Sequence, residues 1–303
     1  MDIRQLMYFQ KVAELEHMTK AAEQLQVSQP FLSRTIASLE EDLGVPLFDH
    51  GGRQIRLNEY GASFYRRTKK IFLELDDAQK ELKDLALRKD QTVSIVTNTG
   101  LYMPGLLCRF RQDMPDVQFC QVSSPRHRIS RILHDGEADF AITAPPLTDN
   151  PEFDTITLLH EKCVIIYPSG HWLGGREQVL LRDLAKEDFI CALRGFGIRD
   201  LADHFFQTAG IQASIIIETS DTSAIPDYVK NGFGISFSPL SILRQHPLYQ
   251  NGCIDYITAC SPDCIGTIGL TWKKGHYLTC ANRQFLDFAI HYFAGLDHGL
   301  GRF

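Results

Sequence analysis

Side chains that can read DNA bases are concentrated in one short run, SQPFLSR. An amide such as Gln29 or a hydroxyl such as Ser33 can exchange hydrogen bonds with base edges in a major groove, and Pro30 can touch a thymine methyl group. The hydroxyl of Ser28 and the guanidinium of Arg34 can bind phosphate oxygens. These residue types predict a set of DNA contacts.

Such contacts need a helix that is buried on its opposite face, and the surrounding sequence predicts one. Apolar residues recur at helical spacing and form one stripe: Leu32, Ile36, Leu39 and Leu43. Upstream, Ala21, Ala22 and Leu25 place small and apolar residues on one face, so that a second helix can cross closely. Between the two helices, Ser28 is a candidate N-cap and Pro30 suits the start of a helix. This pattern predicts a helix-turn-helix, with an ordinary helical hairpin as the alternative.

The residues that follow predict a two-stranded wing. The run GVPLF ends the second helix, and Gly51 and Gly52 then form a hairpin tip. Glycine at such a tip lets the backbone approach a phosphate. Arg53 beside it supplies a positive charge, so we predict a phosphate contact from Arg53.

This N-terminal region resembles the DNA-binding domain of LysR-type transcriptional regulators. The resemblance rests on the runs RQLMYF, AAEQL, SQPFLSRTIASLEEDLGVPLF and GRQIRLNEYG. The family usually carries arginine at the position of His50 and threonine at that of Asn58. A histidine weakens a phosphate contact near neutral pH. The Asn58 side chain can still cap the next helix.

The bulk composition is that of an ordinary globular protein and leaves DNA affinity to local charge. The 303 residues are 44% hydrophobic and 22% charged, and they suffice for two or three compact units. The net charge is −6, and residues 1–70 hold ten Lys and Arg against nine Asp and Glu. We therefore expect modest non-specific affinity for DNA and a reliance on dimerisation.

Neither a membrane contact nor a bound metal or cofactor is expected. The charged N-terminus does not resemble a signal peptide, and no uninterrupted apolar run reaches the length of a membrane span. We therefore expect a cytoplasmic protein whose eight cysteines are reduced thiols. None of them forms a CxxC pair, and Cys260 and Cys264 lack a matching His or Cys pair.

Residues 59–87 predict one long helix, because they contain no proline and only one glycine. At the rise of an α-helix it is about 40 Å long. Its apolar residues step by fours and threes, as in a two-stranded coiled coil. We assign four of them to a dimer interface: Ile71, Leu75, Ala78 and Leu82. A surface helix that packs on its own domain is the alternative.

From Thr92 onward, short apolar strands alternate with amphipathic helices, which predicts α/β lobes with a mostly parallel sheet. The strands are expected at residues 93–96, 117–122, 140–143, 163–167, 189–192, 215–218, 235–238 and 265–272. The family resemblance continues in RILHDGEADFAI and VKNGFGISFSP. It implies a two-lobed effector domain resembling type 2 periplasmic binding proteins, whose chain crosses between the lobes near Leu158–Lys162 and Pro262–Thr267.

The expected fold class is therefore α+β and α/β, in four parts. These are a winged helix-turn-helix (1–58), a linker and dimerisation helix (59–88), a first effector lobe (92–161 and 267–295) and a second effector lobe (162–266).

Loops that follow the predicted strands are the candidate sites for a small molecule, because ligands of α/β sheets bind beyond the carboxyl ends of strands. The residues assigned to effector binding are Thr97, Asn98, Thr99, Arg126, His127, Phe196, Ile198, Arg199, Asp221 and Thr222. Their hydroxyls and guanidinium groups favour a carboxylate or another small anion. Thr99 and Asp221 could instead be ordinary helix caps. Arg199 could instead pair with Asp200 or Asp203.

Together these features predict a sequence-specific transcriptional regulator whose DNA contacts respond to a small molecule bound between two lobes. An enzyme is not expected, since the chain lacks P-loop, HExxH and GxSxG motifs. The expected partners are double-stranded DNA, the effector, further copies of the chain in a homodimer or homotetramer, and RNA polymerase. The alternative is a redox-sensing regulator, in which Arg194 lowers the pKa of Cys191.

Overall fold

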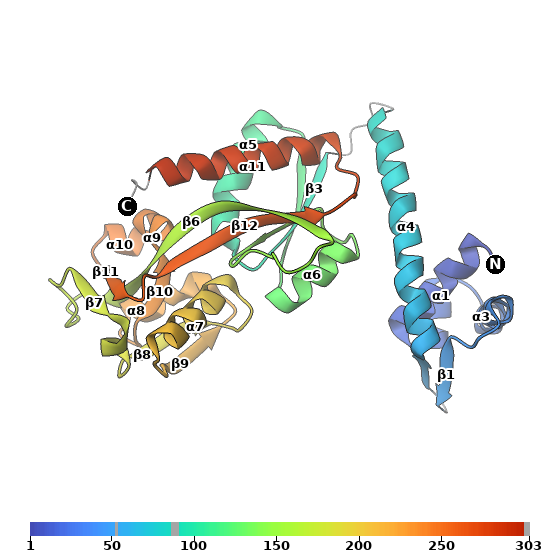
Figure 1. Ribbon diagram of the computed structural model, residues 1–303, viewed down its shortest axis with the longest axis horizontal. Helices are drawn as coiled ribbons and strands as arrows, with labels where there is room; N and C mark the ends of the chain where they lie inside the picture. The colour runs from blue at the N-terminus through green and yellow to red at the C-terminus, as the bar shows by residue number, and fades with distance from the viewer. Residues whose placement is uncertain (52–53, 86–90, 300–303) are drawn as a thin grey trace. The chain divides into compact units, whose positions relative to one another are not determined.

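A computed structural model of the chain describes residues 1–51, 54–85 and 91–299 (Figure 1). These residues form two units, which divide near Leu82. The first unit holds the predicted helix-turn-helix, and the second holds the predicted lobes. Arg53, to which we assigned a phosphate contact, lies outside the described residues.

The N-terminal unit contains a helix-turn-helix followed by a wing. Its elements are α1 (Ile3–Leu15), α2 (Met18–Gln24), α3 (Gln29–Leu43), β1 (Phe48–Gly51), β2 (Gln54–Leu57) and α4 (Glu59–Leu85). A capping box starts α1, because the Asp2 and Gln5 side chains each accept a hydrogen bond from the other's backbone amide. The strands β1 and β2 pair antiparallel, with Phe48 opposite Leu57.

The apolar stripe predicted on the second helix packs into the core of this unit. Three of its residues are buried and the fourth is half-buried: Leu32, Ile36, Leu39 and Leu43. On α2, Ala21 and Ala22 are buried against the same core, and Leu25 is half-buried. The prediction of two helices that cross over small residues is confirmed, and the polar face of α3 is left outside the core.

Two side chains fix the wing to the helices around it. The Glu40 carboxylate on α3 accepts hydrogen bonds from the backbone amides of Leu47 (2.7 Å) and Phe48 (3.3 Å). After the wing, the Asn58 side chain accepts a hydrogen bond from the Gly61 amide at 2.9 Å. This confirms that Asn58 caps the following helix in place of threonine.

The long helix α4 confirms the helix predicted after the wing. Its first half belongs to the N-terminal core, where Phe64, Tyr65 and Phe72 pack and Thr68 is buried. Farther along, the apolar residues assigned to a dimer interface are exposed, with 44% of Ile71, 38% of Leu75 and 65% of Leu82 accessible, and Ala78 exposed as well.

An eight-stranded sheet organises the C-terminal unit. Its order is β4-β3-β5-β12-β6-β11-β7, and β10 also pairs with β6. The strands are β3 (Thr92–Thr97), β4 (Gln118–Ser123), β5 (Phe140–Thr143), β6 (Phe153–Pro168), β7 (Gln178–Leu180), β10 (Ser236–Pro239), β11 (Ile254–Ser261) and β12 (Ile265–Lys273). A further pair, β8 (Asp188–Ala192) with β9 (Ser214–Thr219), is parallel.

The prediction of a mostly parallel sheet is wrong at the centre. β3 pairs parallel with β4 and β5, but β6 pairs antiparallel with β12, β11 and β10. The cause is that β6 and β12 are long strands that run in opposite directions through both lobes. The sequence pattern showed the second half of β6 but neither its first half nor β11 and β7.

Helices cover the sheet in both lobes (Figure 1). They are α5 (Met103–Asp113), α6 (Arg126–His134), α7 (Gly197–Ala209), α8 (Ile225–Lys230), α9 (Leu240–Gln245), α10 (Pro247–Gln250) and α11 (Cys280–Gly299), with short 3-10 turns η1 (Gly100–Tyr102), η2 (Leu181–Leu184) and η3 (Thr222–Ala224). Alternate residues of a strand face different helices. On β6, for example, Ile165 packs with α7, and Ile166 packs with α8 and α9.

Each lobe has its own core, and the chain crosses between them twice. On β6, Leu159 packs in the first-lobe core, whereas Cys163 packs in the second-lobe core. In the return crossing, Cys264 belongs to the second core and Ile268 to the first. Both crossings lie where the family resemblance implied. None of the helices in the described part of the chain has the length and apolar character of a membrane span.

Gly61 allows α4 to start close against the wing, because a Cβ at this position would collide with the Leu47 carbonyl oxygen. We expect Gly61→Ala to lower the free energy of unfolding by about 1–3 kcal/mol through overpacking. The matched control is Gly295→Ala in α11, where a Cβ meets no atom within 4 Å, and there alanine should stabilise by up to about 1 kcal/mol. Urea unfolding followed by circular dichroism measures both, and changes of the same sign would contradict this explanation.

Candidate functional site

The face of α3 that points away from the core carries the side chains assigned to DNA. Gln29, Pro30 and Arg34 are exposed, and Ser33 is half-buried. Ser28 occupies the N-cap position but makes no capping hydrogen bond with its side chain, so the hydroxyl is left for another partner. All five therefore lie at the N-terminal end of α3, where a major-groove helix meets the bases.

Sequence reasoning missed an aromatic neighbour of this face. The Phe31 side chain is 44% exposed, and its ring meets the edge of Tyr8 with 6.2 Å between the centroids. An apolar residue beside the stripe was a usable signal, because Phe31 falls outside the spacing that buries Leu32 and Ile36. It places an apolar surface next to the polar side chains of α3.

A cavity of about 270 Å³ lies between the two lobe cores. Tyr102 and Ile268 of the first core and Cys163 of the second core all line it. Its polar lining consists of hydroxyl groups, one amide and one carboxylate: Thr99, Tyr102, Ser123, Ser220, Thr222, Asn98 and Glu161. The cavity is therefore lined from both lobes and presents polar groups to a small molecule.

Half of the residues assigned to an effector meet in this cavity: Asn98, Thr99, Phe196, Ile198 and Thr222. The Asn98 amide holds two loops together, since it donates to the Ala144 carbonyl and accepts from the Ala144 amide, each at 3.0 Å. The Gly197 amide in turn donates to the Asn98 carbonyl at 2.8 Å. These bonds join the loop after β3 to the start of α7 in the other lobe.

The remaining assigned residues have other surroundings. The buried Thr97 hydroxyl donates to the Ile142 carbonyl at 2.7 Å and so joins neighbouring strands. Asp221 accepts hydrogen bonds from the amide and hydroxyl of Ser223, as a helix cap does. Arg126 and His127 line a separate, more open pocket of about 540 Å³. There the Arg126 guanidinium donates to the carbonyls of Pro145 and Pro146.

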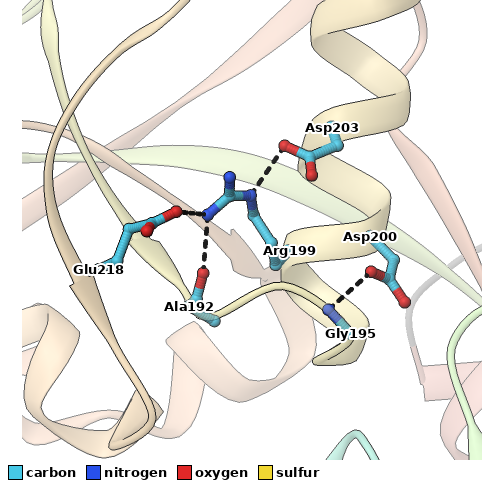
Figure 2. Close-up of polar contacts among 6 residues, drawn as sticks. All are labelled: Ala192, Gly195, Arg199, Asp200, Asp203 and Glu218. Carbon is cyan, nitrogen blue, oxygen red and sulfur yellow. Dashed lines mark hydrogen bonds and ion pairs between the residues drawn. The ribbon is translucent and has the colours of Figure 1, made fainter. Parts of the chain in front are cut away.

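Arg199 is held by protein partners (Figure 2), and it does not line the cavity. Only 2% of its surface is exposed. Its guanidinium pairs with Asp203 at 2.8 Å and with Glu218, and it donates to the Ala192 carbonyl at 3.0 Å. Asp200 accepts instead from the Gly195 amide at 3.1 Å. Of the two alternatives for Arg199, pairing with Asp203 is confirmed.

The expectation of an anionic effector therefore loses its basis. It depended on guanidinium groups that face the ligand, but Arg199 is neutralised by two carboxylates and Arg126 is occupied by backbone carbonyls. Among the described residues that line the inter-lobe cavity, there is no Lys, Arg or His.

Glu161 is the charged residue that sequence reasoning missed. It lies on β6 at the crossing between the lobes and is 2% exposed. Its carboxylate accepts hydrogen bonds from the Ser241 amide (3.0 Å) and hydroxyl (2.7 Å). Burial raises the pKa of the Glu161 carboxyl against the opposing effect of these bonds. The usable signal is an acid between the apolar residues Leu158 and Leu159 and the apolar run that begins at Cys163, because the expected strand starts only at Cys163.

Two titratable groups face Glu161, and both stay neutral near physiological pH. Burial, followed by the nearby Glu161 charge, raises the pKa of the Tyr102 hydroxyl. The same two causes, in the same order, raise the pKa of the Cys163 thiol. The Tyr102 side chain is buried beside Ser241 and the Glu161 carboxyl, and its hydroxyl makes no hydrogen bond of normal geometry.

Two family models match the chain. The one described as "Bacterial regulatory helix-turn-helix protein, lysR family" matches residues 3–62, and the one described as "LysR substrate binding domain" matches residues 91–294. The chain belongs to the LysR family of transcriptional regulators. It is thus a DNA-binding regulator with an effector-binding domain, and the prediction that it is not an enzyme is confirmed.

Proteins similar to this LysR-type regulator match it over nearly their full length. The uncharacterized HTH-type transcriptional regulator YybE of Bacillus subtilis is 34% identical over 299 residues, which are 97% of this chain and 100% of YybE. Full-length OxyR of Pseudomonas aeruginosa has a TM-score of 0.71 at 22% identity, over 97% of this chain and 94% of that one. Full-length CbnR in complex with its target DNA has a TM-score of 0.65 at 21% identity, over 96% and 99%. The two structures show that the fold is shared.

The structure argues against the redox alternative for this LysR-type regulator. Burial raises the pKa of the Cys191 thiol to about 11, although Arg199 lowers it. The cation that lowers the pKa of Cys191 is thus Arg199 and not Arg194, and burial raises this pKa by more than Arg199 lowers it. A thiol with a raised pKa is a poor thiolate nucleophile at neutral pH. Cys163 and Cys264 are buried too, and burial also raises the pKa of both.

Arg199 should contribute to the stability of the second lobe. We expect Arg199→Ala to lower the free energy of unfolding by about 2 kcal/mol, because hydrogen bonds to charged groups are lost while the half-exposed carboxylates regain water. Arg194→Ala, which removes an exposed arginine five residues earlier, should leave that free energy unchanged. Urea unfolding measures both variants, and equal effects would contradict the structural role of Arg199.

The raised pKa of Glu161 predicts a pH-dependent stability. The folded protein takes up a proton at a higher pH than the unfolded chain, so lowering the pH from the folded-state pKa towards the ordinary value favours the folded state. Relative to Glu161→Gln, the wild type should therefore gain stability as the pH falls. Urea unfolding of both proteins across a pH series measures this difference. Glu177→Gln controls for the loss of one exposed carboxylate. The prediction would be contradicted if the free energy of unfolding of the wild type, minus that of Glu161→Gln, stayed constant or increased as the pH rises.

Proposed function

We propose that this regulator reads its operator with α3 and is controlled by a small molecule in the inter-lobe cavity. The observation that carries the first part is the two-sided character of α3, which is buried along Leu32, Ile36 and Leu39 and polar at its exposed N-terminal end. That arrangement suits a helix whose first residues enter a major groove. CbnR, which has a similar fold, has been solved bound to its target DNA.

Within α3, we assign Gln29 and Ser33 to base edges and Pro30 to a thymine methyl group. Ser28 and Arg34 are assigned to phosphates, where they set the position of the helix without reading sequence. Arg53 in the wing is assigned to a phosphate as well.

We further propose that α4 pairs two copies of the chain. Its support is the exposed apolar row formed by Ile71, Leu75, Ala78 and Leu82, which the N-terminal unit leaves uncovered. A helix pair along this row places two α3 helices on one DNA molecule. The resulting homodimer can join a second one in a homotetramer, and contact with RNA polymerase then conveys the signal to transcription.

The effector acts by binding different packings of the assembly with different affinity, because a ligand that binds all packings equally shifts none of them. The cavity suits this role, since its lining comes from both lobes and a ligand in it fixes their separation.

Footprinting of the full-length protein on the DNA upstream of its own gene, across a salt series, tests the DNA contacts. Arg34→Ala should weaken binding to every sequence and reduce the slope of log K against log[salt] by about 1. Gln29→Ala should instead cost about 1–3 kcal/mol at one base-pair position and relax the preference there. Gln112→Ala on α5, also an exposed glutamine, should change neither. Equal losses of Gln29→Ala on all sequences would exclude base reading by Gln29, and no sequence-specific protection by the wild type would exclude the function.

A further inference from the structure

The inter-lobe cavity holds a buried carboxyl group, that of Glu161, for which it supplies no positive partner. Glu161 is 2% exposed, and the groups beside its carboxylate are all neutral, among them the Ser241 amide and hydroxyl and the Tyr102 hydroxyl. None of the described residues lining the cavity is Lys, Arg or His. A buried carboxylate without a cation is costly, so either a proton or a bound cation compensates it.

A second polar group in the cavity, the Tyr102 hydroxyl, lies beside Glu161 and Ser241. Tyr102 is 4% exposed and lines the cavity, and its hydroxyl makes no hydrogen bond of normal geometry. Its oxygen can accept a hydrogen bond as well as donate one. Glu161 and Tyr102 therefore offer two acceptors to a ligand group that carries several N–H donors, as an ammonium group does.

The other side of the cavity is apolar and continues into a smaller pocket of about 130 Å³. The two share Leu101, Ile198, Thr222 and Pro239. Beyond them the smaller pocket is lined mainly by apolar side chains, among them Ile166, Ile225, Phe237, Ile242 and Leu243, and its polar residues are Ser223, Ser238 and His246. A ligand whose polar end lies at Glu161 can thus bury an apolar body in the direction of α8 and α9.

We propose that the effector is a small amphiphilic amine whose ammonium group binds the Glu161 carboxylate and the Tyr102 oxygen, with its apolar part between Leu101 and Ile198. This inference rests on the proposed function, because it names the ligand class of the same cavity. A carboxylate-bearing ligand is disfavoured there by repulsion from Glu161.

The position of Glu161 explains how such a ligand is sensed. Glu161 lies on β6 between Leu159 of the first core and Cys163 of the second, so it sits in the crossing itself. Tyr102 belongs to the first lobe, whereas Ser241, which donates to Glu161, lies on α9 in the second lobe. An ammonium group bound to Glu161 and Tyr102 therefore joins elements of both lobes, and its affinity depends on how close they are.

Isothermal titration of the full-length protein with n-pentylamine, 1-pentanol and pentanoate tests this inference, because these probes share one chain length and differ in their polar end. We expect pentylamine to bind most tightly and pentanoate most weakly, with at least about a tenfold difference between them. Glu161→Gln keeps the shape and an acceptor but removes the charge. It should weaken pentylamine about tenfold, to the affinity of pentanol, and leave pentanol unchanged.

Glu177→Gln removes an exposed carboxylate of the same lobe and should leave all three affinities unchanged. The order of the three affinities in the wild type does not depend on any variant. It therefore tests the proposal even if circular dichroism shows that Glu161→Gln is misfolded. Tighter binding of pentanoate, no saturable binding of pentylamine, or full pentylamine affinity in a folded Glu161→Gln protein would each overturn the proposal. Footprinting of the same preparations separates the two claims, since sequence-specific protection without amine binding refutes the ligand class alone.

Discussion

The antiparallel pairing of β6 with β12 is the constraint on which the C-terminal unit depends. The two strands pair from Phe153 opposite Lys273 to Lys162 opposite Ile265, and this ladder runs through both lobes. Its register shifts between Ile268 and Gly269, near the place where the chain passes from one core to the other. The other strands of the eight-stranded sheet join it on one side through β12 and on the other side through β6. The inter-lobe cavity lies beside this pair, because its lining includes Glu161 and Cys163 of β6 and Gly266 and Ile268 of β12.

Local patterns were enough to predict the N-terminal unit and much of the second. The stripe from Leu32 to Leu43 is a property of one helix, and the cap at Asn58 involves a residue three positions away. Both can be read from a short window of sequence. The pairing of β6 with β11 and β12 joins residues about a hundred positions apart, so the period of the apolar residues could not show it.

The candidate effector site shows the same limit more sharply. Residue types predicted that Asn98, Thr99, Phe196, Ile198 and Thr222 would lie near a ligand, and the loops do converge there. Residue type alone could not decide whether an arginine faces the ligand. The partner of Arg199 that lies on β9, Glu218, is nineteen positions along the chain, and only the fold brings it within reach. Glu161 presents the opposite case, since it lies before the expected strand at 163–167 and only the fold shows that β6 continues through it.

The clamp formed by Glu40 has a mechanical consequence for a protein that holds DNA. One carboxylate of α3 binds the two backbone amides at which the wing begins, and Asn58 binds the helix that leaves it. These hydrogen bonds fix the start of the wing to α3 and the end of the wing to α4. On the function proposed above, a single N-terminal unit built in this way binds its half-site in one fixed geometry. Any response of the DNA to an effector must then come from the distance and tilt between such units, while the contacts within each one stay the same.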